Sequence, residues 1–432
     1  MPHAAGGQDT MGHFTRVHKT IGAITILAAS VLTLCGSSLG SSASATTAGE
    51  RTVRVDASLA KTASGTPFKI GYIENNVSLG AGNINPYTIP AFQAWAKWQN
   101  ANGGIDGHPV QVITQREPDN PGIALTDVNK LISQGIVALV SDDTQDETSW
   151  MPTITKDSIP TFEGTSGSVN LATSPLNFST QVSLLYTPEA IVGAAKKSGS
   201  TDMAVFYCGE IPECAESVPA FAGAGKAIGV NVAFSGSILG SAPNYTAQCL
   251  TAKAHNATSL EVADASQIII RVAANCAQQG YTPHEITSST NIERAMATAP
   301  GMNGLISFES TMPFFDTSFP GIKTMTAAFN KYDPGLTKMS GYGDLSTNQW
   351  TTGLLIAAGA KSGGVGTSEP LTTAALLKGM YSLHSTNLGG MIPTETFVAG
   401  KPQQNKCWFW ASIKNKKFTM PYGTKVACIP AS

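Results

Sequence analysis

Short apolar runs alternate with stretches of helical spacing along the first third of the chain. Two stretches in which apolar side chains recur at helical spacing predict helices, at residues 87–101 and 122–134. Four short runs predict strands, at residues 68–73, 110–114, 136–140 and 159–162. The third of these runs is apolar throughout, which is typical of a strand that is covered on both faces in a parallel sheet.

A second series of strand–helix units begins near residue 187, where Thr187-Pro188 predicts a helix start. Strands are expected at 203–207, 230–234, 258–262, 284–288 and 304–308, and helices over 215–228 and 266–279, the latter capped by Ser266. Later segments predict helices over 321–332, 344–360 and 371–380 and a strand ribbon at 407–413 and 417–418. Two such series predict an α/β protein with two doubly wound lobes.

The N-terminus has the pattern of an export signal. Two basic residues precede an uncharged apolar run at 21–34, which suits a signal peptide and is short for a membrane-spanning helix. The small residues Ala43-Ser44-Ala45 fit a cleavage site. We expect a signal peptide over 1–45 and a flexible leader over 46–66, with a transmembrane anchor as the alternative.

Cysteine usage agrees with export. Cys35 ends the apolar run, where a bacterial lipoprotein carries its lipid anchor, and lipidation there stays open beside cleavage near Ala45. The other six cysteines are even in number, which in an exported chain indicates disulfides, although six cysteines permit fifteen pairings. Pairing of neighbours is the simplest expectation, as Cys208–Cys214, Cys249–Cys276 and Cys407–Cys428. No metal site is predicted, since there is no CxxC motif and the histidines are scattered.

Charge and motifs narrow the class of function. The chain has 27 Lys+Arg against 29 Asp+Glu and only 13% charged residues, so it lacks the basic surface of a nucleic-acid-binding protein. A G-x-S-x-G match at 36–40 lies in the signal segment, and 223–227 is an incomplete phosphate loop. The acidic pairs Asp142-Asp143 and Asp146-Glu147 could be a catalytic or metal site, or a solvated strand end. We therefore expect no catalytic residue and no cofactor.

Several motifs resemble one family. Residues 100–110 (NANGGIDGHPV) are similar to the N-A-x-G-G-I-x-G segment of the type I periplasmic solute-binding proteins of ABC importers, of the branched-chain amino-acid-binding (leucine/isoleucine/valine-binding) type. Gly280-Tyr281, Gly341-Tyr342 with the following helix, and the segment 389–410 resemble later parts of that family. The resemblance covers residues 67–420.

The resemblance implies two Rossmann-like lobes joined by a hinge of three crossovers, near 178–184, 307–310 and 388–392. Lobe 1 would comprise 67–183 plus 311–388, and lobe 2 would comprise 184–310 plus 389–432. It also implies a monomeric, extracytoplasmic binding protein and no enzyme. Such a protein captures a small polar solute, an amino acid or a related compound, and delivers it to the permease subunits of an ABC importer. The alternatives are a ligand-sensing receptor of the same fold and a secreted α/β enzyme.

Ligand contacts are expected where strands end, because doubly wound sheets bind ligands beyond the carboxyl ends of their strands. In lobe 1 the candidates follow the first, third and fourth strands and are Glu74, Asn75, Asp142, Asp143, Thr144, Gly164, Thr165 and Ser166. The last two loops match positions where the family holds a ligand carboxylate. Thr165 and Ser166 could hold that anion at a helix N-terminus or could simply cap the helix.

In lobe 2 the corresponding candidates are Glu210, Asp264, Ser266, Thr290 and Glu309. Amino-acid binders of the family often place an acid near Thr290 to pair with the ligand ammonium, and Asp264 could take that role from the adjacent loop. Asp264 could instead cap the following helix, and Glu309 could lie on the surface. A Cys208–Cys214 bridge would fix the loop that carries Glu210 at the rim of the cleft.

Overall fold

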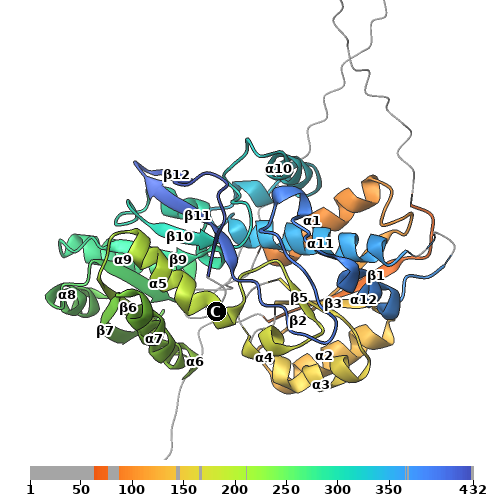
Figure 1. Ribbon diagram of the computed structural model, residues 1–432, viewed down its shortest axis with the longest axis horizontal. Helices are drawn as coiled ribbons and strands as arrows, with labels where there is room; N and C mark the ends of the chain where they lie inside the picture. The colour runs from red at the N-terminus through yellow and green to blue at the C-terminus, as the bar shows by residue number, and fades with distance from the viewer. Residues whose placement is uncertain are drawn as a thin grey trace, which may run out of the picture. The chain divides into compact units, whose positions relative to one another are not determined.

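The computed structural model describes residues 63–75, 87–142, 146–164, 168–210, 212–364, 366 and 369–429 (Figure 1). The predicted signal peptide, Cys35 and most of the predicted leader lie outside the described residues. The last residues of that leader are bonded to the fold, because Gly65 N donates to Gly107 O at 2.9 Å and His108 Nδ1 lies 2.8 Å from Thr66 O. Within the described part of the chain, no helix has the length and apolar character that crossing a bilayer requires.

The first sheet is parallel and has five strands in the order β2-β1-β3-β4-β5. The strands are β1 (Phe68–Asn75), β2 (Val110–Glu117), β3 (Ala138–Asp142), β4 (Thr161–Glu163) and β5 (Asn177–Ser179). The connecting helices are α1 (Thr88–Ala101), α2 (Pro121–Ser133), α3 (Glu147–Lys156) and α4 (Val169–Thr173). The strand order reverses between β1 and β3, which is where a doubly wound sheet offers a ligand crevice.

The second sheet has the order β12-β11-β10-β9-β8-β6-β7, with β13 paired to β11. Its parallel part is β6 (Asp202–Cys208), β7 (Asn231–Ile238), β8 (Ser259–Ala263), β9 (His284–Ser288) and β10 (Ile306–Glu309). The antiparallel end is β11 (Cys407–Lys414), β12 (Lys417–Thr419) and β13 (Ala427–Cys428). Its helices are α5 (Thr187–Lys197), α6 (Pro212–Glu216), α7 (Val218–Ile228), α8 (Thr246–Ala254) and α9 (Ser266–Gln278). The order reverses between β6 and β8, so the two sheets repeat one topology and confirm the predicted two-lobed α/β class.

Three later helices return to the first lobe. They are α10 (Pro320–Tyr332), α11 (Asp344–Ser362) and α12 (Thr373–Ser382), and α10 and α11 both pack against α1. Trp98 of α1 stacks obliquely on Trp350 of α11, with ring centroids 4.9 Å apart. A Cβ on Gly353 would overlap the ring of Trp95, so only glycine allows α11 to approach α1 this closely.

The chain passes between the lobes three times, and the three segments are hydrogen-bonded to one another. Val182 N donates to Ser310 Oγ at 3.0 Å, which joins the first crossover to the second. Ser183 N donates to Asn405 O at 2.9 Å, which joins the first to the third. Met312 N donates to Met391 O at 2.7 Å, which joins the second to the third. The number of crossovers is the one predicted, but the third extends from the predicted 388–392 to Asn405, since Phe397 packs on Phe178 of the first sheet with ring centroids 5.5 Å apart and β11 begins at Cys407.

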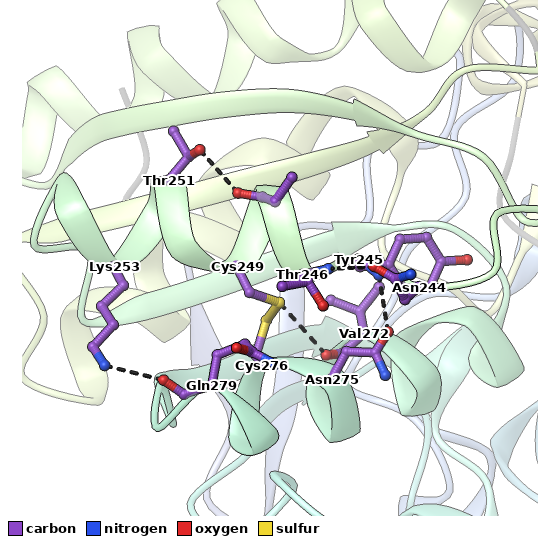
Figure 2. Close-up of a disulfide and its surroundings, with 11 residues drawn as sticks. Asn244, Tyr245, Thr246, Cys249, Thr251, Lys253, Val272, Asn275, Cys276 and Gln279 are labelled. Carbon is purple, nitrogen blue, oxygen red and sulfur yellow. Dashed lines mark hydrogen bonds between the residues drawn. A yellow bond between two sulfur atoms is a disulfide. The ribbon is translucent and has the colours of Figure 1, made fainter.

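The six described cysteines pair as neighbours, as Cys208–Cys214, Cys249–Cys276 and Cys407–Cys428. Figure 2 shows the second bridge, which joins α8 to α9 and is completely buried. Two further contacts support the same helix pair: Asn275 Oδ1 accepts from Tyr245 N at 2.9 Å, and Lys253 Nζ donates to Gln279 O at 3.1 Å. Among the fifteen possible pairings the structure therefore contains the simplest one.

Several local predictions were wrong. The expected helix 215–228 is divided into α6 and α7 at Ser217, the N-cap of α7, because Pro219 in the first turn of α7 has no N–H to continue the hydrogen-bond pattern of α6. Ser266 does not cap α9 and Thr187 does not cap α5, since the N-cap positions are Ala265 and Tyr186 and neither helix has a side-chain cap bond. Helix α3 and strand β5 were not predicted at all.

Candidate functional site

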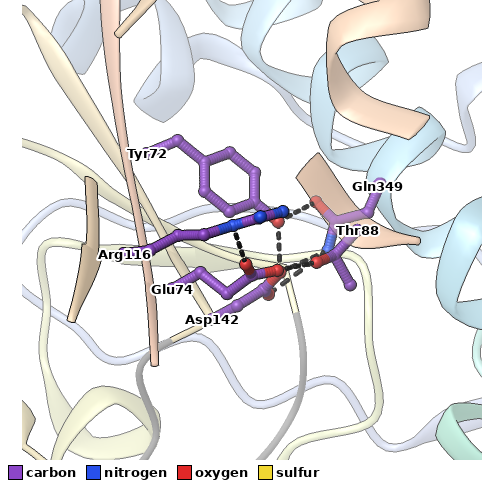
Figure 3. Close-up of polar contacts among 6 residues, drawn as sticks. All are labelled: Tyr72, Glu74, Thr88, Arg116, Asp142 and Gln349. Carbon is purple, nitrogen blue, oxygen red and sulfur yellow. Dashed lines mark hydrogen bonds and ion pairs between the residues drawn. The ribbon is translucent and has the colours of Figure 1, made fainter. Parts of the chain in front are cut away.

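Three side chains form a closed polar network at the carboxyl edge of the first sheet (Figure 3). Tyr72 of β1 and Asp142 of β3 are neighbours across the reversal point, and Gln349 of α11 reaches them from above the sheet. Tyr72 Oη is bonded to Asp142 Oδ2 and lies 2.9 Å from Gln349 Oε1, while Gln349 Nε2 donates to Asp142 Oδ2 at 3.1 Å. All three side chains have no exposed surface.

The protonation state of Asp142 sets the direction of these bonds. Tyr72 has one hydroxyl hydrogen and two neighbouring acceptors, so it donates to Asp142 when that carboxyl is ionised and can donate to Gln349 when a proton on Asp142 supplies the other bond. Burial is the main cause that raises the pKa of Asp142, to about 7, and the negative charge of Glu74 adds to it. The bonds from Tyr72 and Gln349 lower that pKa. At neutral pH the network therefore exchanges between a neutral and a charged form.

Glu74 lies beside this network and is also internally paired. Its carboxylate is fully buried and forms an ion pair with Arg116 of β2 at 2.7 Å, and it accepts a hydrogen bond from Thr88 of α1. Burial raises the pKa of Glu74, and Thr88 and Arg116 partly offset that rise. The side chain of Arg116 is 49% exposed, so this pair joins the buried edge to the surface.

The remaining lobe 1 candidates divide into two groups. Asn75 is buried at the end of β1, and a Cβ on Gly164 would overlap the side chains of Asp142 and Gln349. Four candidates lie outside the described residues: Asp143, Thr144, Thr165 and Ser166. The capping alternative for the last two is wrong, because α4 begins at Val169 and Ser168 Oγ accepts from Leu171 N at 3.2 Å. Their ligand role stays a prediction.

The second sheet brings two carboxylates together at its own reversal point. Glu210 follows β6 and Asp264 follows β8, and the charge of Glu210 contributes to a raised pKa of Asp264, about 6, for which partial burial is the main cause. Arg271 lowers that pKa, but its guanidinium is held by the carbonyl oxygens of Gly240, at 2.7 Å, and Ala242. Glu210 Oε1 accepts from Gly240 N at 2.7 Å, so this edge is tied together by backbone contacts.

Asp264 has one free acceptor. Its Oδ1 accepts from Ala265 N at 2.7 Å, while Oδ2 has no hydrogen-bond partner among the described residues. The adjacent loop supplies hydroxyls at the same edge: Ser266 Oγ donates to Asn291 O at 3.0 Å, and Thr290 Oγ1 lies 2.8 Å from Ser288 Oγ. Four of the lobe 2 candidates thus follow neighbouring strand ends.

Glu309 does not belong to that group. Its side chain is fully buried at the end of β10, so the alternative of a surface role is wrong. It interacts with Asp344, the first residue of α11; burial is the main cause that raises the pKa of both carboxyls, and the charge of Asp344 raises that of Glu309 further. Asp344 Oδ1 also accepts from Phe314 N at 2.7 Å, which places this acid pair at the second crossover.

The three described members of the acidic cluster at the end of β3 are not exposed to solvent. Asp142, Asp146 and Glu147 are 0%, 5% and 2% exposed, and Asp146 is the N-cap residue of α3. No group of three or more His, Cys, Asp or Glu side chains in the described ranges has the arrangement of a metal site.

Sequence reasoning missed residues that the fold brings to these edges from far along the chain. Gln349 and Asp344 lie on α11, and no local motif marks them. Glu293 is different, because it is the acid that follows Thr290 by three positions. It is 5% exposed, and burial raises its pKa to about 7. Burial is the main cause that raises the pKa of Tyr87 on the other lobe, and the charge of Glu293 adds to it. Its place in the sequence shortly after β9, where amino-acid binders of the family often have an acid, could have marked Glu293 as a candidate.

Comparisons with known proteins agree on one fold. The chain is similar to an extracellular ligand-binding receptor from Verminephrobacter eiseniae, with 16% identity and a TM-score of 0.68 over 82% of this chain and 100% of that one. It is similar to a fatty acid ABC transporter substrate-binding protein from Thermomonospora curvata, with 15% identity and a TM-score of 0.65 over 84% and 92%. A possible leucine/isoleucine/valine-binding protein from Rhodopirellula baltica SH 1 gives 13% identity and a TM-score of 0.67 over 84% and 98%.

At these identities the structures show the fold and not the solute. A sequence search of the curated proteins finds no match. The family model described as periplasmic binding protein matches residues 67–417, which is most of the chain. The two repeated sheets, the three crossovers and this match lead to one conclusion: the chain belongs to the periplasmic binding protein family, with the type I fold.

Proposed function

We propose that the chain is an exported solute-binding protein that captures a small solute between the carboxyl edges of its two sheets and delivers it to an ABC importer. The family and the three-crossover hinge support this proposal. Bending at such a hinge buries a solute between two lobes and gives a membrane partner two forms to distinguish. One structural neighbour is itself named as the substrate-binding protein of an ABC transporter.

The proposed solute carries a cationic group, as amino acids do. The observation that carries this proposal is the free Oδ2 of Asp264 beside Glu210, because the nearby cation, Arg271, is already held by backbone carbonyls. A partly buried carboxylate without a partner is stabilised when a ligand ammonium pairs with it. The hydroxyls of Thr144, Thr165 and Ser166, which were predicted from the sequence, are the proposed contacts for the anionic end of the solute.

Calorimetry with a panel of amino acids tests this proposal. Asp264→Asn should weaken the bound amino acid by about tenfold or more, because it removes a desolvated counter-charge. Asp202→Asn is the matched control, since Asp202 lies at the opposite end of β6 and bonds to Thr201 and Asn231. Equal affinity of both variants and the parent protein would reject Asp264 as the counter-charge.

The pH dependence of binding gives a second test. The pKa of Asp264 is raised to about 6, so its carboxylate is increasingly protonated as the pH falls through that value. The affinity for a cationic solute should therefore be lower at pH 5 than at pH 7.5, and Asp264→Asn should remove most of this dependence.

Export and anchoring are proposed from the sequence. Cleavage near Ala45 gives a free mature chain, and lipidation at Cys35 gives one held at the membrane surface. The intact mass of the protein recovered from its native host distinguishes the two. The lobe boundaries and the monomeric state are also proposals, and the scattering curve of the purified protein, with and without solute, tests both.

A further inference from the structure

A cavity of about 250 Å³ lies between β12 at the edge of the second sheet, helix α10 and the loop that leads into α11. None of the candidate solute contacts lines it. The lining residues that matter are Arg294, Phe314, Phe315, Thr326, Tyr342 and Phe418. A cavity of about 150 Å³ is sufficient for benzene, so this one has room for an aromatic ring system with a substituent.

The walls are aromatic and suit a flat ring. Phe315 and Phe418 are stacked, with centroids 5.0 Å apart and planes at 10°. Phe314 meets Phe418 and Tyr342 edge-on, at 5.6 Å and 5.3 Å. Phe315 and Phe418 are only half-buried. Exposed ring faces and edges around a small volume provide the offset and edge-to-face contacts that aromatic rings prefer.

One of the residues that line the cavity, Arg294, is a cation without a carboxylate partner among the described residues. Arg294 is exposed, and its guanidinium carbon lies 5.4 Å from the centroid of the Tyr342 ring. The ion pair found among the described residues joins Arg116 to Glu74, so no carboxylate in the described ranges lies within ion-pair distance of Arg294. A guanidinium presents two parallel N–H donors to a carboxylate, and it is less costly to desolvate than an ammonium.

Two hydroxyl groups in the inner wall of the cavity lack good hydrogen bonds. Tyr342 is 2% exposed, and its hydroxyl interacts with that of Thr326, but neither oxygen has a hydrogen bond of good geometry among the described residues. Burial raises the pKa of Tyr342 to about 12, so this hydroxyl is neutral at physiological pH. Natural interiors leave few such groups unpaired, and this side of the molecule is therefore not packed as a closed core.

We propose that this cavity is a second ligand site, which binds an aromatic carboxylate with its ring among the phenylalanines and its carboxylate on Arg294. The volume favours a small molecule over a protein segment, and the unpaired guanidinium favours an anion over a neutral ring.

The site would connect the two lobes. Arg294 and Phe418 belong to the second sheet and its loops, whereas Thr326 belongs to α10, which packs on α1, and Tyr342 lies in the loop that leads into α11. Phe314 and Phe315 follow the second crossover, two and three residues after Met312, which bonds to Met391. A ligand here contacts both sides of the hinge, so it should change solute affinity at the carboxyl edges, and the solute should change its affinity by the same factor.

Calorimetry of the purified full chain with 2-naphthoate tests the proposal, with 2-naphthalenemethanol as the uncharged analogue. Arg294→Gln should weaken 2-naphthoate by about tenfold and leave the alcohol within about twofold, because only the ion pair is lost. Phe418→Ala should weaken both. Arg294 is exposed, so its variant is expected to fold, and thermal unfolding checks this.

Asp264→Asn separates this site from the solute site, because it should leave 2-naphthoate binding unchanged. Two results would overturn the proposal. One is the absence of 2-naphthoate binding at millimolar concentration. The other is binding that Asp264→Asn abolishes and that Arg294→Gln and Phe418→Ala leave intact, which would place the probe in the interlobe site.

Discussion

The two carboxyl edges use their acidic side chains in opposite ways. At the first edge, Glu74 and Asp142 are fully buried and bonded to protein groups that come from β1, β2, α1 and α11. At the second edge, Glu210 is exposed, and Asp264 is half-buried with one oxygen that has no partner among the described residues. The same topology therefore places an internal network on one lobe and available charge on the other.

This difference indicates separate roles for the edges. Buried, internally satisfied polar networks fix geometry, because each member left without its partner is costly. Carboxylates that remain available can pair with a ligand instead. We infer that the first edge holds its loops in position and that the second edge supplies the charge that recognises the solute.

The largest expected effect is the difference in the free energy of unfolding between variants that lack one acid at the first edge and one at the second. At pH 5, where Asp142 is protonated, Asp142→Ala leaves Tyr72 and Gln349 without their partner and should lower the free energy of unfolding by about 3 kcal/mol. Asp264→Ala should change it by less than about 1 kcal/mol while it weakens solute binding. Urea unfolding measures both, and a larger loss for Asp264→Ala would contradict the contrast.

The pH dependence of stability should be next in size. The pKa of Asp142 is raised to about 7, so between the unfolded value near 4 and that value the folded protein binds more protons than the unfolded chain. Stability should therefore fall as the pH rises from about 4 to about 7, by about 3 kcal/mol for this group.

Asp142→Asn carries a neutral side chain of the same shape at every pH, so it should reduce this slope in thermal unfolding. A smaller slope should remain, because burial also raises the pKa of Glu293 and Glu395 to about 7. An identical slope in the variant and the parent protein would show that Asp142 is not the titrating group.

Removing the Cys208–Cys214 bridge tests the second edge alone. The closed loop is short, so its loss should lower the free energy of unfolding by only about 1–2 kcal/mol. The affinity for the solute should fall by more than this small loss of stability would cause, since Glu210 lies within the loop. The double Cys→Ser variant at Cys249 and Cys276 is the control, with a larger loss of stability and an unchanged affinity per folded molecule. Calorimetry beside urea unfolding separates the two effects.

The smallest expected effect is that of Arg116→Gln. This change removes the counter-charge of Glu74, but the guanidinium is half exposed and screened by water, so we expect a loss of no more than about 1 kcal/mol at pH 7. The loss should vanish near pH 4, where Glu74 is protonated in the folded protein. A loss that is equal at both pH values would indicate packing by the arginine stem instead.

Elements with a continuous pattern could be predicted from the sequence, and short or interrupted ones could not. Strand β9 was predicted at the residues it occupies, and α11 within two residues, because their patterns are uninterrupted. Strand β5 has three residues, too few for any periodicity, and α3 contains Pro152, which conceals its helical character. Strand β3 extends to Asp142 because Tyr72 and Gln349 provide partners for a polar residue at its end.

The candidate site could be predicted only where it depends on chain order. That Glu210, Asp264 and Thr290 follow neighbouring strands is a consequence of strand–helix alternation, which the sequence shows. The partners of Asp142 are different, because Gln349 lies 207 residues further along and meets it only when α11 returns to the first lobe. Burial of Glu309 has the same origin, since it depends on Asp344 at the start of that helix.

The bonds between the crossover segments restrict how the molecule can move. Since Val182, Ser310, Met312, Met391 and Asn405 belong to mutually bonded chains, a backbone rotation in one chain strains the other two unless all rotate together. Sliding of one lobe against the other would break these bonds, whereas a concerted bend of the three segments can preserve them. Whichever lobe the solute contacts first, the closing motion would then change one quantity that a membrane partner can distinguish, the angle between the two lobes.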